Sequence, residues 1–267
     1  MGGKQTDLDY IPGNPRLLLI APHGFNQFTD DEIDRDYDDC TAEITAEVAK
    51  KIGCQAIINR KWRKETQPAR DYNKVKEAKK DNDFFPALHA AANKKAPLLV
   101  LWIHGVEDNN IKAEARKEDT NYNGKPDDLH ALIGYGQGLN KQKKCDKTAY
   151  KKTVNQIQAL LTQKGMTAVP ARDNAPNYRG CDTNRMNQWF RNEKYRLKHV
   201  QSLQLEIKKT GFREQKDVKK TANILAVALA EYVGLELRAP VSQKVDNEKL
   251  IELFLALIKS INWRFRF

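Results

Sequence analysis

Two histidines and a glutamate stand where the sequence predicts the ends or the interior of strands. His23 and His104 each follow a short apolar run, and Glu206 lies within a segment of alternating polar and apolar residues. In an open parallel sheet, ligands bind beside the carboxyl ends of the strands. Catalytic zinc typically takes histidine nitrogens and a carboxylate, with one position left open. The residue types and their placement therefore indicate a metal site at one edge of a sheet.

Each of the two histidines is followed by glycine. Gly24 follows His23, and Gly105 follows His104. Glycine has no Cβ, so backbone and ligand can approach each other closely at these positions. We therefore expect both glycines to leave room for a ligand.

A cluster of acidic residues after His23 supplies candidate carboxylates. Its members are Asp30, Asp31, Glu32, Asp34, Asp36, Asp38 and Asp39. The cluster precedes a predicted helix, and acidic residues also favour the positive end of a helix dipole. Most of them could therefore be solvated or capping residues while one ligates a metal. Spacing alone does not choose the ligand.

The segments that must position these residues alternate between strands and helices. Short apolar or alternating runs predict strands at residues 16–21, 55–59, 96–103, 131–134, 166–170 and 202–207, the last with one face exposed to a cleft. Helical spacing predicts helices at residues 41–52, 74–93 with a break near Pro86, 147–164, 218–233 and 247–261. We expect an α/β fold in a single domain over residues 1–267, with its core at 15–235. Its mainly parallel or mixed sheet should carry helices on both faces.

Several blocks together resemble the N-formylglutamate amidohydrolase family. They occur in the family's order from about residue 15 to residue 235. The blocks are Leu-Leu-Leu-Ile-Ala-Pro-His-Gly at 17–24, Asp-Asp-Cys-Thr at 38–41, Ile-Ile-Asn-Arg at 57–60, Arg-Asp-Tyr-Asn at 70–73, Trp-Ile-His-Gly at 102–105 and Leu-Gln-Leu-Glu-Ile at 203–207.

The resemblance implies a zinc-carboxypeptidase-like fold and hydrolysis of an amide beside a carboxylate. It implies that Zn²⁺, or another divalent metal, is held by His23, His104 and an acidic residue. For the third ligand we select Asp38, because it lies three residues before the start of the predicted helix. Asp36 and Asp39 remain alternatives. Glu206 would be the general base.

The substrate would be a small anionic amide or peptide. The resemblance implies that Arg70 and Asn73 help to hold its carboxylate. Arg179 and Arg185 are further candidates, because a guanidinium fork suits a terminal carboxylate better than an ammonium group does.

The formal net charge of +11 raises the alternative of a basic nucleic-acid-binding α/β protein. The lysines, however, occur as short doublets spread along the whole chain, which is typical of solvated faces. We therefore expect no nucleic-acid partner, and a basic field that attracts an anionic substrate. A relative that keeps the fold but lacks catalysis is the other alternative.

Cys40, Cys54, Cys145 and Cys181 show no CxxC spacing. In a chain of this length they are expected to be free thiols in a reducing compartment. The apolar stretches near the end contain charged residues and are too short to cross a bilayer. We therefore expect a cytoplasmic protein without a membrane partner.

Overall fold

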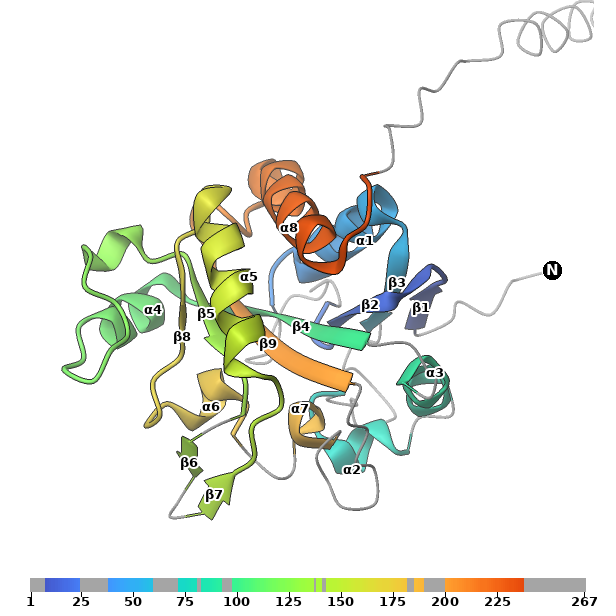
Figure 1. Ribbon diagram of the computed structural model, residues 1–267, viewed down its shortest axis with the longest axis horizontal. Coiled ribbons are helices and arrows are strands. Elements are labelled where there is room, and N and C mark those ends of the chain that lie inside the picture. The colour runs from blue at the N-terminus through green and yellow to red at the C-terminus, as the bar shows by residue number, and fades with distance from the viewer. Residues whose placement is uncertain are drawn as a thin grey trace, which may run out of the picture. The chain divides into compact units, whose positions relative to one another are not determined.

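β4 (Leu98–Val106) and β9 (Val200–Lys208) pair near the middle of a mixed β-sheet in the computed structural model (Figure 1). The structure describes residues 8–24, 38–59, 72–80, 83–92, 98–136, 138–140, 143–181, 185–189 and 200–237. Within these ranges the sheet has the strand order β1-β3-β2-β4-β9-β5-β8. Its other strands are β1 (Leu8–Ile11), β2 (Asn14–Ala21), β3 (Cys54–Asn59), β5 (Ala131–Gly134) and β8 (Ala168–Pro170).

Two groups of parallel strands make up the sheet. β3, β2, β4 and β9 run parallel to one another. β5 pairs antiparallel with β9, and β8 pairs parallel with β5, so these two strands run in the opposite direction. β1 lies antiparallel to β3 at the other end. The apolar run at 17–21 is completely buried within β2, as expected for a strand covered on both faces.

Helices cover both faces of the sheet. α1 (Thr41–Ile52), α5 (Lys151–Gln163) and α8 (Val218–Val233) pack on one face in the larger hydrophobic core. α3 (Phe84–Ala92) and α7 (Met186–Trp189) contribute to the core on the other face. The shorter elements are α2 (Val75–Ala78), α4 (Asp108–Ala115), α6 (Pro176–Arg179), the 3₁₀ turns Pro126–Asp128 and Gln215–Asp217, and a separate antiparallel pair, β6 (Gly138–Asn140) and β7 (Lys143–Cys145). The predicted α/β class with a mixed, doubly covered sheet is confirmed.

Most predicted elements are present with small shifts. The helices predicted at 41–52 and 218–233 have those bounds, and the one predicted at 147–164 begins at Lys151. The stretch predicted as one interrupted helix forms α2 and α3, and Pro86 lies in the first turn of α3, where its missing N–H leaves no hydrogen bond unmade. The chain divides into the units Met1–Leu237 and Arg238–Phe267, and the predicted helix at 247–261 lies outside the described residues.

One face of β9 was predicted to be exposed to a cleft, and this is wrong. Gln204 is 3% exposed and Glu206 6% exposed. The reason is that neighbouring segments cover this face: Ser202 Oγ donates a hydrogen bond to Asn187 Oδ1 of α7 at 2.6 Å. Gln204 Nε2 donates to the carbonyl oxygen of Asn177 in α6 at 3.0 Å. The polar residues of this strand are therefore held in a buried network.

The prediction of four free thiols is also wrong for one pair. Cys145, at the end of β7, forms a disulfide with Cys181, which follows α6, and their Cα atoms are 5.5 Å apart. Folding brings together two cysteines separated by 36 positions, a spacing that carries no sequence signal. Cys40 and Cys54 form no disulfide bond. Stable disulfides are typical of oxidising compartments, so the cysteines do not support the predicted cytoplasmic location.

Loss of this disulfide should destabilise the protein. Closing a loop of this length is expected to contribute about 3–4 kcal/mol by restricting the unfolded chain. The double substitution Cys145→Ser with Cys181→Ser should lower the free energy of unfolding in urea by this amount. Cys40→Ser, at a half-buried free thiol, is the control and should change it little. A reductant that leaves the wild-type urea midpoint unchanged would contradict the prediction.

None of the helices in the described ranges is both long enough and apolar enough to span a membrane.

Candidate metal centre

The two histidines and Glu206 reach one edge of the sheet from three neighbouring strands. His23 lies in the turn directly after β2. His104 lies inside β4, and its partner in the register of β9 is Glu206. Cα atoms paired across adjacent strands lie about 4.8 Å apart, and their side chains point to the same face of the sheet. β2 is the other neighbour of β4, so the strand order brings all three residues together.

Asp38 is fixed beside His23 by its own backbone. Its N–H donates to the carbonyl oxygen of His23 at 3.2 Å. Its carbonyl oxygen accepts hydrogen bonds from Thr41 at the start of α1, from the backbone N–H at 3.3 Å and from the hydroxyl at 2.9 Å. The sequence Asp-Asp-Cys-Thr thus ties the first turn of α1 to the turn after β2.

Both imidazoles contact the same carboxylate oxygen of Asp38. Asp38 Oδ2 lies 3.2 Å from His23 Nδ1 and 3.3 Å from His104 Nδ1. Each of the three residues offers one ligand atom, and these atoms all lie within 4.8 Å of one another. The histidine rings meet edge to face, with centroids 5.0 Å apart. Zinc bonds of about 2.0–2.1 Å in a tetrahedral site give ligand-to-ligand distances of about 3.3–3.4 Å, and the two distances to Asp38 Oδ2 match this value.

The pKa values of the two carboxyl groups at this centre are shifted in opposite directions. Burial alone would raise the pKa of Asp38, but hydrogen bonds from His104 and His23 outweigh it and hold that pKa below its usual range. Burial, together with the negative charge of Asp38, raises the pKa of Glu206 to about 8. A divalent cation at the cluster would add positive charge and lower this pKa. Asp38 is thus suited to stay ionised as a ligand, and Glu206 to exchange a proton near neutral pH.

Glu206 also has neighbours that orient it. Gln204 Nε2 donates to Glu206 Oε1 while bonding to the carbonyl of Asn177 in α6. Tyr178 is the next residue of α6. Burial raises the pKa of Tyr178, and the negative charge of Glu206 raises it further, so the two side chains interact electrostatically. α6 therefore lies beside the general-base candidate.

The glycines after the histidines are required by packing, a role that the sequence-based expectation did not include. A Cβ on Gly105 would lie 2.3 Å from Cζ of Arg213. A Cβ on Gly24 would lie 2.8 Å from Cβ of Ala42 in α1. Gly105 is thus required by a buried guanidinium group, and Gly24 by the close approach of a helix.

Arg213 is a residue that sequence reasoning missed. It is 1% exposed, and its guanidinium donates to three backbone carbonyls. These belong to Ile207 at 2.7 Å, Asp39 at 3.1 Å and Val106 at 3.3 Å. Ile207 and Asp39 directly follow Glu206 and Asp38, and Val106 is two residues after His104. One side chain therefore joins the three segments that carry the site residues.

The other acidic candidates have different positions. The carboxylate of Asp39 pairs with Lys209 Nζ at 2.6 Å and is not part of the cluster. Asp36 lies outside the described residues. Of the described candidates, Asp38 is the one that the fold brings to the histidines.

Two of the proposed substrate-binding residues lie near each other. Lys74, next to Asn73, forms an isolated backbone bridge with Arg185, and the carbonyl oxygen of Asn73 accepts a hydrogen bond from Met186 N–H at 2.7 Å. Asn73 is buried. Arg70 lies outside the described residues. Binding of a substrate carboxylate by these residues stays a prediction.

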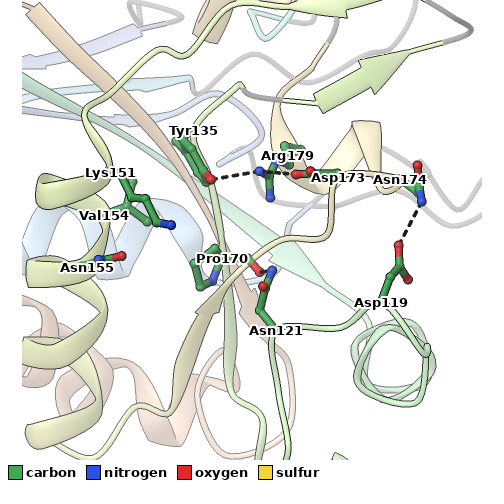
Figure 2. A pocket seen from close by; sticks show the side chains of 10 residues that line it. All are labelled: Asp119, Asn121, Tyr135, Lys151, Val154, Asn155, Pro170, Asp173, Asn174 and Arg179. Atoms are coloured by element: carbon green, nitrogen blue, oxygen red, sulfur yellow. Dashed lines mark hydrogen bonds and ion pairs between the residues drawn. The ribbon is translucent and has the colours of Figure 1, made fainter.

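Arg179 is turned away from the cluster. Its buried guanidinium donates to the hydroxyl of Tyr135 at 2.9 Å and pairs with the carboxylate of Asp173 (Figure 2). It also donates to the carbonyl oxygen of Ala171. Tyr135 belongs to the core beneath α1, α5 and α8, as do Ile103 and Leu205.

His104 and Glu206 follow Ile103 and Leu205 directly, so their side chains point to the opposite face of the sheet. The guanidinium of Arg179 is therefore not placed to bind a substrate at the cluster. This corrects the expectation drawn from its residue type.

Comparisons with solved structures identify the fold. An N-formylglutamate amidohydrolase from Ralstonia eutropha JMP134 aligns with a TM-score of 0.53 and 14% sequence identity, over 85% of this chain and 98% of that chain. A bacteriophage poly-gamma-glutamate hydrolase aligns with a TM-score of 0.46 and 16% identity, over 85% of this chain and 89% of that chain. A metallo-carboxypeptidase from Burkholderia cenocepacia aligns with a TM-score of 0.43 and 10% identity, over 82% of this chain and 56% of that chain.

No protein-family model matches the sequence, and no curated protein matches it. At such low identity, the likeness to the amidohydrolase shows a shared fold. A shared fold does not define an activity, which depends on the residues of the site.

Proposed function

We propose that the protein is a metal-dependent amidohydrolase that cleaves an N-acyl or peptide-like amide next to a carboxylate, as N-formylglutamate amidohydrolase does. One observation carries the proposal: His23, Asp38 and His104 present ligand atoms within 4.8 Å of one another, and Glu206 is the register partner of His104. The resemblance of the sequence blocks and the shared fold support the same reading. The expected metal is zinc or another divalent ion.

His23 Nδ1, His104 Nδ1 and Asp38 Oδ2 would hold the ion. When bound there, a divalent cation supplies Lewis acidity, which polarises an amide carbonyl and makes a coordinated water more acidic. Glu206 accepts the proton of the attacking water and returns it to the leaving nitrogen. Gln204 keeps the Glu206 carboxylate in one orientation through its hydrogen bond.

We assign the substrate's own carboxylate to Asn73 and Arg185, whose segments lie side by side. A guanidinium and an amide can both donate to carboxylate oxygens. The net charge of +11 favours approach of an anionic substrate. We therefore propose a small anionic amide or peptide as the substrate class.

A hydrolysis panel tests the proposal. The full chain, loaded with Zn²⁺, Mn²⁺ or Co²⁺, is incubated with N-formyl-L-glutamate, N-acetyl-L-glutamate and γ-glutamyl peptides, and released amine is measured. We expect cleavage by metal-loaded protein, little by metal-free protein, and slower cleavage of the matched diamide that lacks free carboxylates. If no metal-loaded form cleaves any member of the panel, the proposed activity is wrong and a non-catalytic relative is the better description.

A further inference from the structure

The sheet has a second edge at which parallel strands end. β5 and β8 run parallel to each other and opposite to β9, so their carboxyl ends lie at the other end of the sheet from those of β4 and β9. Ligands in open α/β sheets bind outside the carboxyl ends of the strands. The fold therefore offers a second location of this kind, apart from the cluster of His23, Asp38 and His104.

A pocket of about 430 Å³ lies at this location (Figure 2). Its volume is within the range typical of small-ligand sites. Its polar wall carries amides, charges and a hydroxyl, and Val154 and Pro170 add an apolar patch. The lining residues are Asp119, Asn121, Tyr135, Lys151, Val154, Asn155, Pro170, Asp173, Asn174 and Arg179. None of the residues of the metal cluster, nor Glu206, is among them.

The carboxylates of the pocket already have cationic partners. Asp119 accepts hydrogen bonds from Arg172 Nη1 at 2.5 Å and from Asn174 Nδ2 at 3.0 Å. Asp173 pairs with Arg179, whose guanidinium is held in place by Tyr135 and Ala171. These pairs leave no lining carboxylate to compensate a further cation.

Lys151 is that further cation. It begins α5, and its side chain is directed into the pocket beside Val154 (Figure 2). Within the described part of the chain, its ammonium group makes no hydrogen bond or ion pair, and neither does the amide of Asn155, one turn further along the helix. The first turn of α5 contains no acidic residue. Both groups are therefore available to donate to a ligand.

We propose that this pocket is a second binding site, for a small hydroxylated carboxylate such as a sugar acid. The Lys151 ammonium pairs with the single carboxylate, and Asn155 donates a hydrogen bond to it. Asn121 and the hydroxyl of Tyr135 bond to the ligand's hydroxyl groups, while its carbon ring packs on Val154 and Pro170. One uncompensated cation suits a singly charged group better than a doubly charged phosphate. This site is separate from the proposed amidohydrolase centre, and the inference does not depend on that centre.

A titration with matched sugars tests this inference. The full-length, ¹⁵N-labelled protein is titrated with glucuronate, with glucose, which lacks the carboxylate, and with inorganic phosphate. We expect glucuronate to shift the amide resonances of Lys151 and Asn155 in a saturable way, glucose to bind at least about tenfold more weakly, and phosphate to produce no saturable shift there.

Substitutions then locate the site. Lys151→Met should weaken glucuronate binding about tenfold, because a charged hydrogen bond is lost. Lys152→Met, the adjacent exposed lysine that does not line the pocket, should leave it unchanged, and so should His104→Ala at the metal centre. Equal affinity in the Lys151→Met and Lys152→Met variants, tighter binding of phosphate than of glucuronate, or no saturable shift by glucuronate would each overturn the proposal.

Discussion

Replacement of Glu206 by glutamine is expected to lower turnover by about 10²- to 10⁴-fold while zinc remains bound. Glutamine has nearly the same shape and keeps an oxygen that can accept the hydrogen bond from Gln204. It cannot, however, take a proton from water. Steady-state hydrolysis of the best substrate from the panel, together with the zinc content of the variant, measures both effects.

Glu118→Gln is the matched control for this experiment. Glu118 is exposed and is not part of the cluster, and the substitution removes the same charge. Its turnover should equal that of the wild type. Full activity in Glu206→Gln would remove Glu206 from the mechanism, and loss of zinc from that variant would make it a ligand rather than a base.

Arg213→Met is expected to weaken zinc binding by about 10- to 100-fold and to lower the free energy of unfolding by about 2–4 kcal/mol. The reason is that the guanidinium donates to the carbonyls of Ile207, Asp39 and Val106, which adjoin the residues of the centre. Methionine fills much of the space but donates no hydrogen bond. Zinc affinity is measured by competition with a chelator, and stability by urea unfolding. Arg213→Lys, which keeps the charge and can reach one carbonyl, should recover part of the affinity.

Arg172→Met separates a positioning effect from general destabilisation. Arg172 also forms a network, with Glu114 at 2.5 Å and with Asp119, but this network does not adjoin the cluster. Its loss should lower stability without changing zinc affinity. If both arginine variants lose zinc affinity equally, Arg213 acts through stability alone.

The sequence was sufficient to predict the bounds of the helices that end at a glycine. α1 and α8 have the predicted bounds, because Gly53 and Gly234 follow them in the left-handed conformation, with φ of 73° and 65°. Glycine adopts this conformation without steric cost and so ends a helix cleanly. The buried strand at 17–21 was equally clear from its apolar run.

The meeting of His23, Asp38 and His104 followed from strand order and from the link between Asp38 and Thr41. Sequence spacing alone left Asp36, Asp38 and Asp39 open. The alternation in β9 correctly placed Glu206 on one face with Gln204, but alternation does not reveal what covers a face. Burial by α6 and α7 therefore came only with the fold.

Contacts between residues far apart in the chain could not be predicted from the sequence. Nothing local marks Cys145 and Cys181 as partners, since they meet only after β7 and α6 have packed. Arg213 likewise stands in a polar turn where a solvated arginine would be the usual expectation. Arg179 has the right chemistry for a substrate carboxylate, but its direction depends on which face of the sheet Tyr135 occupies.

Titration of metal-free protein with zinc tests the central claim most directly. The wild type should bind one zinc ion per chain, and His104→Ala should bind it more than about 100-fold more weakly, since a ligand itself is lost. His89→Ala, at an exposed histidine of α3, should bind zinc as the wild type does. Absence of zinc binding by the wild type, or equal affinity in the His104→Ala variant, would contradict the assignment of the metal centre.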